Sequence, residues 1–325
     1  MNTQRIEIPV FYGSYSDLTK LDISFINARI VVYKGTHFRT AFKDFIAPIA
    51  FNRSYRFATK RTDETNLIVD KNVKLYAIIP IDIAKPFTDD NIFHFYELLL
   101  AIFPSDLSIV KTISLIPLDN KFQCGSVSQN PFKSTGDSYF DNFLYIYKTE
   151  YKYIKNFIKT HFENSKKLSY VKYIMSVYTN SFIENNPIYQ FISLMICLEV
   201  IVEGKEQLTY KIKRNVAILC GKNVDSCRII YKNIDQLYKL RSAIVHGEIK
   251  PSYKNFKEYH QYLKKLVARL IRELVVHNIS TIKELNEKLT EIGYSQNNLL
   301  SNGYVYSKYP IMDNMQLSYK AIQKY

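Results

Sequence analysis

The spacing of apolar residues changes along this chain of 325 residues. Before residue 125, apolar side chains alternate with polar ones or form short β-branched runs, which is typical of strands. After residue 136 they recur every three or four positions, as on the buried face of a helix. The pattern predicts an α+β fold, with an N-terminal mixed α/β module over residues 1–136, an all-α bundle over residues 137–292 and a tail over residues 293–325.

The N-terminal module is expected to combine strands with one helix. Its strands are predicted at Arg5–Phe11, Ile23–Tyr33, Val73–Ile83 and Leu107–Ile116. A helix over Asn91–Phe103 would be capped by Asp89 or Asp90 and ended by Pro104. The stretch Gly125–Gly136 is rich in Gly, Ser, Asn and Pro, and we expect it to link the module to the bundle.

The C-terminal part shows helical periodicity almost throughout. Helices are predicted at Ser138–Phe162, Lys167–Ile183, Pro187–Glu203, Lys205–Leu219, Val224–His246, Tyr253–His277 and Thr281–Ile292. The helix at Tyr253–His277 combines an apolar stripe with basic faces that would either follow a phosphate backbone or simply face solvent. These faces carry Lys254, Lys257, Lys264, Lys265, Arg269 and Arg272. The tail is rich in Tyr and Asn, and we expect a strap lying on the surface or across a partner.

The helix after Asn223 holds the residues best suited to chemistry. On a wheel of about 100° per residue, Arg241 lies about 40° from Leu237, inside the apolar stripe. An arginine is always charged and is rarely buried without a partner. His246 and Gly247 follow at the predicted end of the helix, where glycine is a common stop. Plain packing does not require this pair of side chains.

The run LYKLRSAIVHG, Leu237–Gly247, resembles the signature helix of HEPN domains, and most closely that of ApeA-like HEPN proteins. Their hallmark, an arginine and a histidine separated by four to six residues, is matched here by Arg241-x4-His246. The resemblance continues over ICLEVIVEG, which contains Glu199, and over IKRNVAIL, which contains Arg214. It covers roughly residues 187–278, under a third of the chain.

This resemblance implies an endoribonuclease that uses neither a metal nor a cofactor. Relatives of this kind form homodimers with a composite active site, cleave RNA (tRNA included), and arrest growth in bacterial defence against phage. By the same resemblance, the N-terminal module would sense a phage-derived trigger or a regulatory partner. The alternative is a catalytically silent HEPN module, a dimerising scaffold that binds RNA or a nucleotide. A third possibility is an ordinary helical interaction protein.

The chemistry of the two motif residues agrees with RNA cleavage. The sequence lacks a Gly-rich phosphate loop, a His-Glu-x-x-His or Cys/His metal pattern and a Gly-x-Ser-x-Gly elbow. His246 suits proton transfer because an imidazole titrates near neutral pH. Arg241 suits a phosphate because its guanidinium is a planar, permanently charged fork. Attack by the ribose 2′-hydroxyl would leave a 2′,3′-cyclic phosphate and a 5′-hydroxyl.

Helical geometry limits how these two side chains can meet. Positions five apart on a regular helix point about 140° away from each other. Arg241 and His246 of one chain therefore converge only if the helix loosens before Gly247; otherwise a second copy completes the site across a twofold axis. In the purely structural alternative, Arg241 pairs with Glu199 and His246 caps the helix, where it interacts favourably with the dipole.

Other residues are expected to assist this pair. Glu199 would orient Arg241 or stabilise the bundle through Arg214, and Ser242 would touch the phosphate. Tyr238 would stack on a base or pack in the core. The candidates for RNA contacts, each with a solvated surface as its alternative role, are Tyr238, Lys239, Arg214 and Lys250.

The composition of the chain bears on its binding partners and on its cellular compartment. The net charge of +14 favours a polyanion, nucleic acid before a membrane surface, unless the lysines merely solvate the surface. The four cysteines form no Cys-x2-Cys pair, which suits a reducing cytoplasm. The N-terminus does not resemble a signal peptide, and the apolar run Phe191–Val202 is too short to span a bilayer. We expect a soluble, cytoplasmic protein.

Overall fold

The computed structural model describes residues 5–34, 36–48, 50–53, 73–82, 84–85, 87–105, 107–118, 120–129, 143–184, 186–204, 207–248, 253–294 and 317. The chain divides into two compact units, residues 1–96 with 105–159 and residues 97–104 with 160–325. Their secondary structure is mixed α+β, as the sequence predicts. The boundary that the sequence suggests at residue 136 lies outside the described residues.

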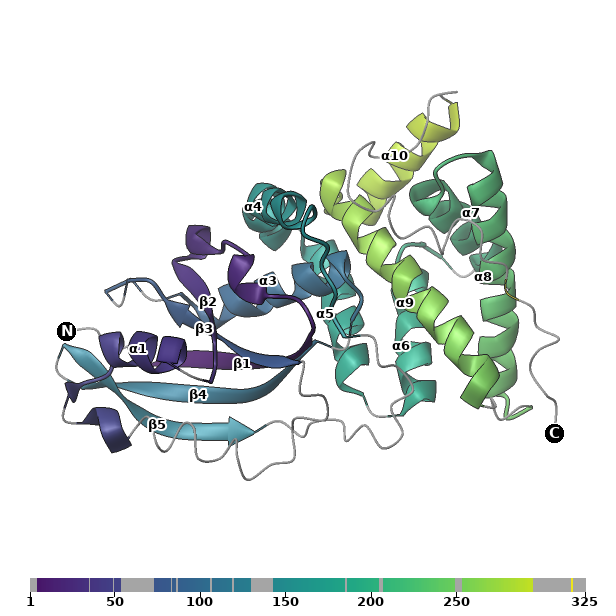
Figure 1. Cartoon of the computed structure of the whole chain (residues 1–325). Helices are drawn as coiled ribbons and strands as arrows, with labels where there is room; N and C mark the ends of the chain where they lie inside the picture. Colours follow the sequence, from purple (N-terminus) through teal and green to yellow (C-terminus); the bar gives the residue numbers. More distant parts are fainter. Residues whose placement is uncertain are drawn as a thin grey trace. The chain divides into compact units, whose positions relative to one another are not determined.

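The first unit is built on an antiparallel sheet. Its strands, among the described residues, are β1 (Ile6–Ser14), β2 (Ala28–Val32), β3 (Lys74–Pro80), β4 (Ser108–Leu118) and β5 (Lys121–Gln129). They lie in the order β2-β3-β1-β4-β5, and every neighbouring pair is antiparallel (Figure 1). The chain crosses from β1 over to the edge strand β2 and returns through β3, so β1 is central and buried on both faces, and only Glu7 along it is partly exposed.

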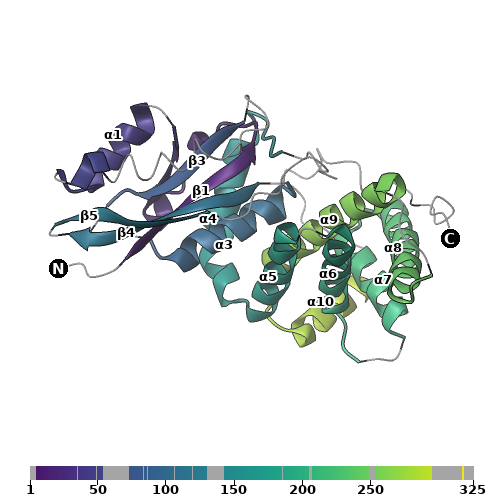
Figure 2. The same ribbon diagram turned by 90° about the horizontal axis from the view of Figure 1, so that it is seen from below.

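Helices cover both faces of this sheet. Helix α1 (Thr36–Phe45) lies on one face and buries Phe38, Phe42 and Phe45, while α3 (Asp89–Ile102) lies on the other (Figure 2). Helix α3 starts with two aspartates, which favour a helix N-terminus, and ends just before Pro104, as predicted.

Two predictions for the first unit are wrong, and one helix was missed. The strand expected at Ile23–Tyr33 starts only at Ala28, because residues Ser24–Ile26 form a 3-10 helix that ends at Asn27 in the left-handed conformation. The expected linker Gly125–Gly136 is paired backbone as far as Gln129, within β5; residues 130–136 lie outside the described residues. Helix α1 is not predicted by the sequence pattern.

The second unit is helical. Its helices are α5 (Ser169–Ile183), α6 (Pro187–Glu199), α7 (Leu208–Cys220), α8 (Val224–Val245), α9 (Tyr253–Val276) and α10 (Ile282–Tyr294), with the second half of α4 (Tyr151–Lys167). Asn186 caps α6 by accepting from the Ile188 N–H. Helix α6 ends four residues earlier than predicted, because the chain turns towards Gly204, whose φ of +82° suits glycine. In the helix expected over Ser138–Phe162, the described residues 143–150 are not helical and α4 begins at Tyr151; residues 138–142 lie outside the described residues.

Helix α9 forms the centre of this unit, where it contacts α5, α6 and α7 (Figure 1). Its basic residues do not all face solvent: Lys264, Arg269 and Arg272 are at most 6% exposed. Arg269 pairs with the buried Glu273 at 3.3 Å, and Arg272 donates to the carbonyl oxygens of Ala101 and Ile102, the end of α3, which belongs to this second unit. The prediction of basic α9 faces that contact phosphate or solvent is therefore wrong for these three residues.

Helix α10 extends into the expected tail as far as Tyr294, and beyond it one residue of the tail is described. The backbone N–H of Leu317 donates to Oδ1 of Asn233, a buried side chain of α8, at 2.9 Å. Leu317 is itself buried, so this residue lies on the helical unit as a surface strap would. The rest of the expected strap lies outside the described residues. Within the part of the chain that the structure describes, no helix is long and apolar enough to cross a bilayer.

Candidate functional site on helix α8

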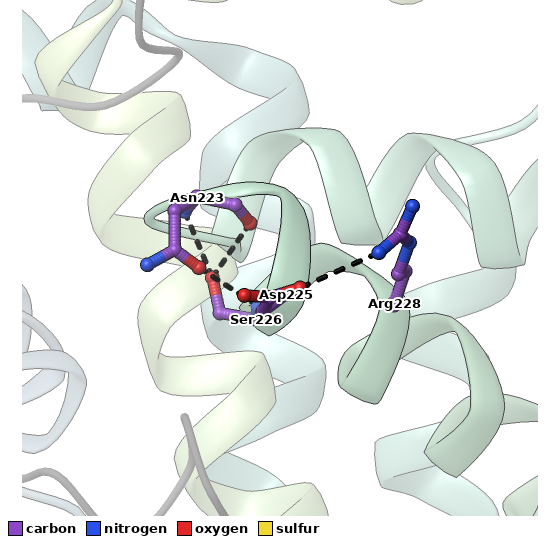
Figure 3. Close-up of polar contacts among 4 residues, drawn as sticks. All are labelled: Asn223, Asp225, Ser226 and Arg228. Carbon is purple, nitrogen blue, oxygen red and sulfur yellow. Dashed lines mark hydrogen bonds and ion pairs between the residues drawn. The ribbon is translucent and has the colours of Figure 1, made fainter.

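Helix α8 begins where the sequence predicts. Oδ1 of Asn223 accepts from the Ser226 N–H at 2.9 Å, and Oγ of Ser226 accepts from the Asn223 N–H at 2.9 Å (Figure 3). This reciprocal cap satisfies two backbone donors that the helix itself leaves unpaired. Asp225 favours the helix N-terminus and pairs with Arg228 at 3.4 Å. The start of α8 is therefore fixed by local side chains.

The other end of α8 is equally well defined. The His246 N–H donates to Ser242 O at 3.0 Å, so the helical bonding continues through the residue after Val245. Gly247 then takes a φ of +69°, and the Glu248 N–H donates back to Ala243 O at 2.8 Å. This is the glycine stop that the sequence predicts. Helix α8 does not loosen before Gly247, which removes one of the two ways in which Arg241 and His246 could meet.

Arg241 is held by a carboxylate from another helix. Its Nη2 lies 3.3 Å from Oε1 of Glu199, the last residue of α6. The hydroxyl of Tyr238 donates to the same oxygen at 3.2 Å. Burial, followed by the negative charge of Glu199, raises the pKa of Tyr238, so this phenol stays a donor. Tyr238 and Arg241, on neighbouring turns of α8, thus both bind the Glu199 carboxylate of α6.

The pair with Glu199 leaves the Arg241 side chain partly accessible from solvent. A guanidinium has five N–H donors, and the pair with Glu199 uses only part of that capacity. The side chain of Arg241 is 34% exposed and that of Glu199 is 23% exposed. Nε of Arg241 is buried and has no hydrogen-bond partner among the described residues. The arrangement fixes the guanidinium in place while an anion can still approach it.

The other predicted site residues lie apart from this group. His246 and Ser242 are exposed on α8, about 140° and 100° round the helix from Arg241. Lys239 is also exposed, and Arg214 is exposed on α7. Among the described residues Glu199 forms its ion pair with Arg241 and not with Arg214. Lys250 lies outside the described residues.

Sequence reasoning missed an ion cluster between α7 and α8. Asp235 accepts from Lys213 of α7 and from Lys239 of α8, both at 2.9 Å. The hydrogen bond from Lys213 lowers the pKa of Asp235. Lys213 also lies 4.7 Å from the ring centroid of Tyr231. The Asp235–Lys239 pair could have been read from its i,i+4 spacing, but only the packing of α7 on α8 brings Lys213 to it.

Comparisons with known proteins assign no role to this site, so its geometry is the evidence for one. No family model, curated protein or solved structure gives a significant match to the chain. Among the described residues, no three His, Cys, Asp or Glu side chains gather closely enough to share a metal ion. The group formed by Glu199, Tyr238 and Arg241, with His246 one turn beyond, is the candidate site.

Proposed function

We propose that the helical unit is a HEPN-type, metal-independent endoribonuclease. The observation that carries this proposal is the arrangement on α8: an arginine anchored by Glu199 and still reachable, followed by an exposed histidine at the defined end of the helix. An anchored cation suits a phosphate because its position need not be reorganised when charge develops there. An exposed histidine can exchange protons with a substrate.

The proposed reaction needs one proton acceptor, one proton donor and one cation. His246 takes the proton from a ribose 2′-hydroxyl, and the oxygen attacks the adjacent phosphorus. The bond from phosphorus to the 5′-oxygen breaks, the leaving oxygen takes up a proton, and Arg241 stabilises the charge on the phosphoryl oxygens. The products are a 2′,3′-cyclic phosphate and a 5′-hydroxyl.

The regular end of α8 supports a site shared between two copies of the chain. Because Arg241 and His246 point about 140° apart on an unbroken helix, one copy does not bring both to the same phosphate. A twofold axis beside α8 would place Arg241 of each copy near His246 of the other. We therefore propose a homodimer with a composite cleft. By resemblance we place it in the cytoplasm, cleaving RNA (tRNA included) in defence against phage, with the first unit answering a phage-derived trigger or regulatory partner.

A second function is favoured by the same ion pair. If the partly buried Arg241 serves only to join α6 to α8, the unit is a catalytically silent scaffold that binds RNA or a nucleotide and dimerises. The two functions separate on total RNA in EDTA, comparing the wild type with Arg241→Ala and His246→Ala, and with His37→Ala as a matched exposed histidine on α1. A nuclease leaves cyclic phosphates and loses about 10²- to 10⁴-fold in rate in both site variants. Cleavage unchanged in His246→Ala would rule out the proposed mechanism.

A further inference from the structure

A short extended segment adds an aromatic surface to the first unit. Residues 143–147 run beside the end of β1, where Leu144 forms a parallel bridge with Ser14. The Tyr15 N–H donates to Leu144 O at 3.0 Å, and the Leu144 N–H donates to Gly13 O at 2.7 Å. The segment is therefore anchored through its backbone, as an added strand would be.

Its side chains alternate sharply between the interior and solvent. Leu144 and Ile146 are 1% and 4% exposed, whereas Tyr145 and Tyr147 are 54% and 51% exposed. Tyr15, on the neighbouring end of β1, is 46% exposed. The anchoring thus buries the aliphatic residues and turns the tyrosines outward, although each tyrosine is a large and partly apolar group.

These rings form two edge-to-face pairs, in which the three tyrosines are exposed while Phe143 is partly buried and also contacts the buried Tyr12. The centroids of Tyr145 and Tyr147 lie 5.0 Å apart with planes at 81°, and those of Tyr15 and Phe143 lie 5.1 Å apart with planes at 82°. We call Tyr15, Phe143, Tyr145 and Tyr147 the aromatic surface. Because neighbouring rings are perpendicular, the surface presents both ring faces and ring edges to solvent.

The charges around the aromatic surface are mainly positive. Lys20 lies 5.9 Å from the ring centroid of Tyr151, and Lys148 and Lys152 are exposed. Among the nearby carboxylates, Asp22 is neutralised by Lys155 at 2.5 Å, and Glu150, which accepts from the Tyr147 N–H, is buried away from solvent. Asp17 keeps its negative charge, because it accepts from the uncharged Thr19 hydroxyl. The exposed lysines fit a polyanion.

From this combination we infer that the aromatic surface binds single-stranded nucleic acid. Unpaired bases stack on exposed aromatic rings, and lysines beside the rings contact the phosphates. A duplex is excluded from this mode because its bases are already stacked on each other. This site belongs to the first unit, whereas the proposed cleavage site belongs to α8 of the second unit.

The test measures binding by the full chain carrying His246→Ala, so that cleavage does not interfere. A fluorescein-labelled oligouridylate is titrated, alone or annealed to oligoadenylate, and followed by anisotropy. Tyr145→Ala with Tyr147→Ala should weaken binding of the single strand by roughly 5- to 150-fold for each base that loses its stack. The corresponding Phe variants should bind normally. Tyr173→Ala, a tyrosine of equal exposure on α5, serves as the matched control.

The salt dependence of binding and photocrosslinking test the proposed site further. Lys148→Gln with Lys152→Gln should reduce the slope of log affinity against log salt by about 0.7 for each phosphate that the lysines no longer neutralise. Photocrosslinking of the oligouridylate to the chain without tyrosine substitutions should label residues 143–152. Three results would each overturn the inference. The Ala variants could bind the single strand as tightly as the unsubstituted chain, or they could lose the same affinity for the duplex as for the single strand. The crosslinks could also be confined to residues other than 143–152. If the Ala variants bind the single strand unchanged, the next ligand to test on the aromatic surface is a protein partner.

Discussion

Nη2 of Arg241 lies 3.3 Å from Oε1 of Glu199, and this pair joins the ends of α8 and α6. The two residues are far apart in sequence, and one carboxylate oxygen also receives the Tyr238 hydroxyl. The pair can therefore position the guanidinium as well as connect two helices. Each role makes a different prediction for a substitution of Glu199.

Glu199→Gln keeps the shape of the side chain and removes its charge. Because both partners are partly exposed, we expect the free energy of unfolding to fall by no more than about 1 kcal/mol. If Glu199 positions Arg241, RNA cleavage should fall by about 10-fold or more under conditions in which the protein stays folded. Urea unfolding and cleavage rates, measured on one preparation, separate the roles. A loss of stability with undiminished cleavage contradicts the positioning role.

Tyr238→Phe removes one hydrogen bond to Glu199 while the ring stays in place. We expect the free energy of unfolding to fall by about 0.5–1.5 kcal/mol, the usual worth of one such bond. Urea midpoints give this value directly. Tyr173→Phe, on an exposed part of α5, should leave the midpoint unchanged. An equal loss in both variants would mean that the Tyr238 bond contributes nothing.

Glu273→Gln should have a much larger effect on stability. Glu273 is 1% exposed and pairs with Arg269, so the substitution removes a buried negative charge that faces a buried guanidinium. Breaking one partner of a buried pair costs about 3–5 kcal/mol. Glu287→Gln is the matched control, because Glu287 pairs with Lys283 at the same i,i+4 spacing on the exposed face of α10. That variant should lose no more than about 0.5 kcal/mol. Equal losses would contradict the buried network.

Stability should fall as the pH drops below neutrality. Burial lowers the pKa values of His161 and His277 below the ordinary value of about 6.5, and the positive charge of Lys288 lowers that of His277 further. The unfolded chain then binds more protons than the folded chain as pH falls through about 6.5, so protonation favours unfolding. Urea midpoints between neutral pH and pH of about 5.5 test this. The slope should lessen in His161→Gln, and a slope of opposite sign would contradict the shift.

Local signals explain which parts of the fold could be predicted. The Asn223 cap and the Gly247 stop of α8 depend on neighbouring residues alone, and both can be read from the sequence. Strand β5 was missed because only pairing with β4, with Phe122 and Val127 buried, distinguishes its Gly- and Ser-containing sequence from a linker. For the same reason Lys264 looked like a surface lysine: its burial comes from tertiary packing.

The site was only partly predictable for a similar reason. The pairing of Glu199 with Arg241 was one of two roles expected for Glu199, the other being a pairing with Arg214, and it was also the pairing expected in the purely structural alternative. The contribution of Tyr238 to the same oxygen was not expected, because its spacing allowed either packing or base stacking. The outward tyrosines of residues 143–147 were also missed, since the sequence pattern of their segment predicts a helix.

The central claim is that each RNA-cleaving site is shared between two copies of α8, so that a dimer holds two such sites. Arg241→Ala and His246→Ala chains should each be inactive alone. When they are dissociated, mixed and reassociated, random pairing should restore roughly a quarter of wild-type cleavage, because half of the dimers then hold one complete set. Either chain mixed with the double variant should stay inactive. Cleavage recovered in the mixture alone supports the shared site; a silent mixture beside an active wild type contradicts it.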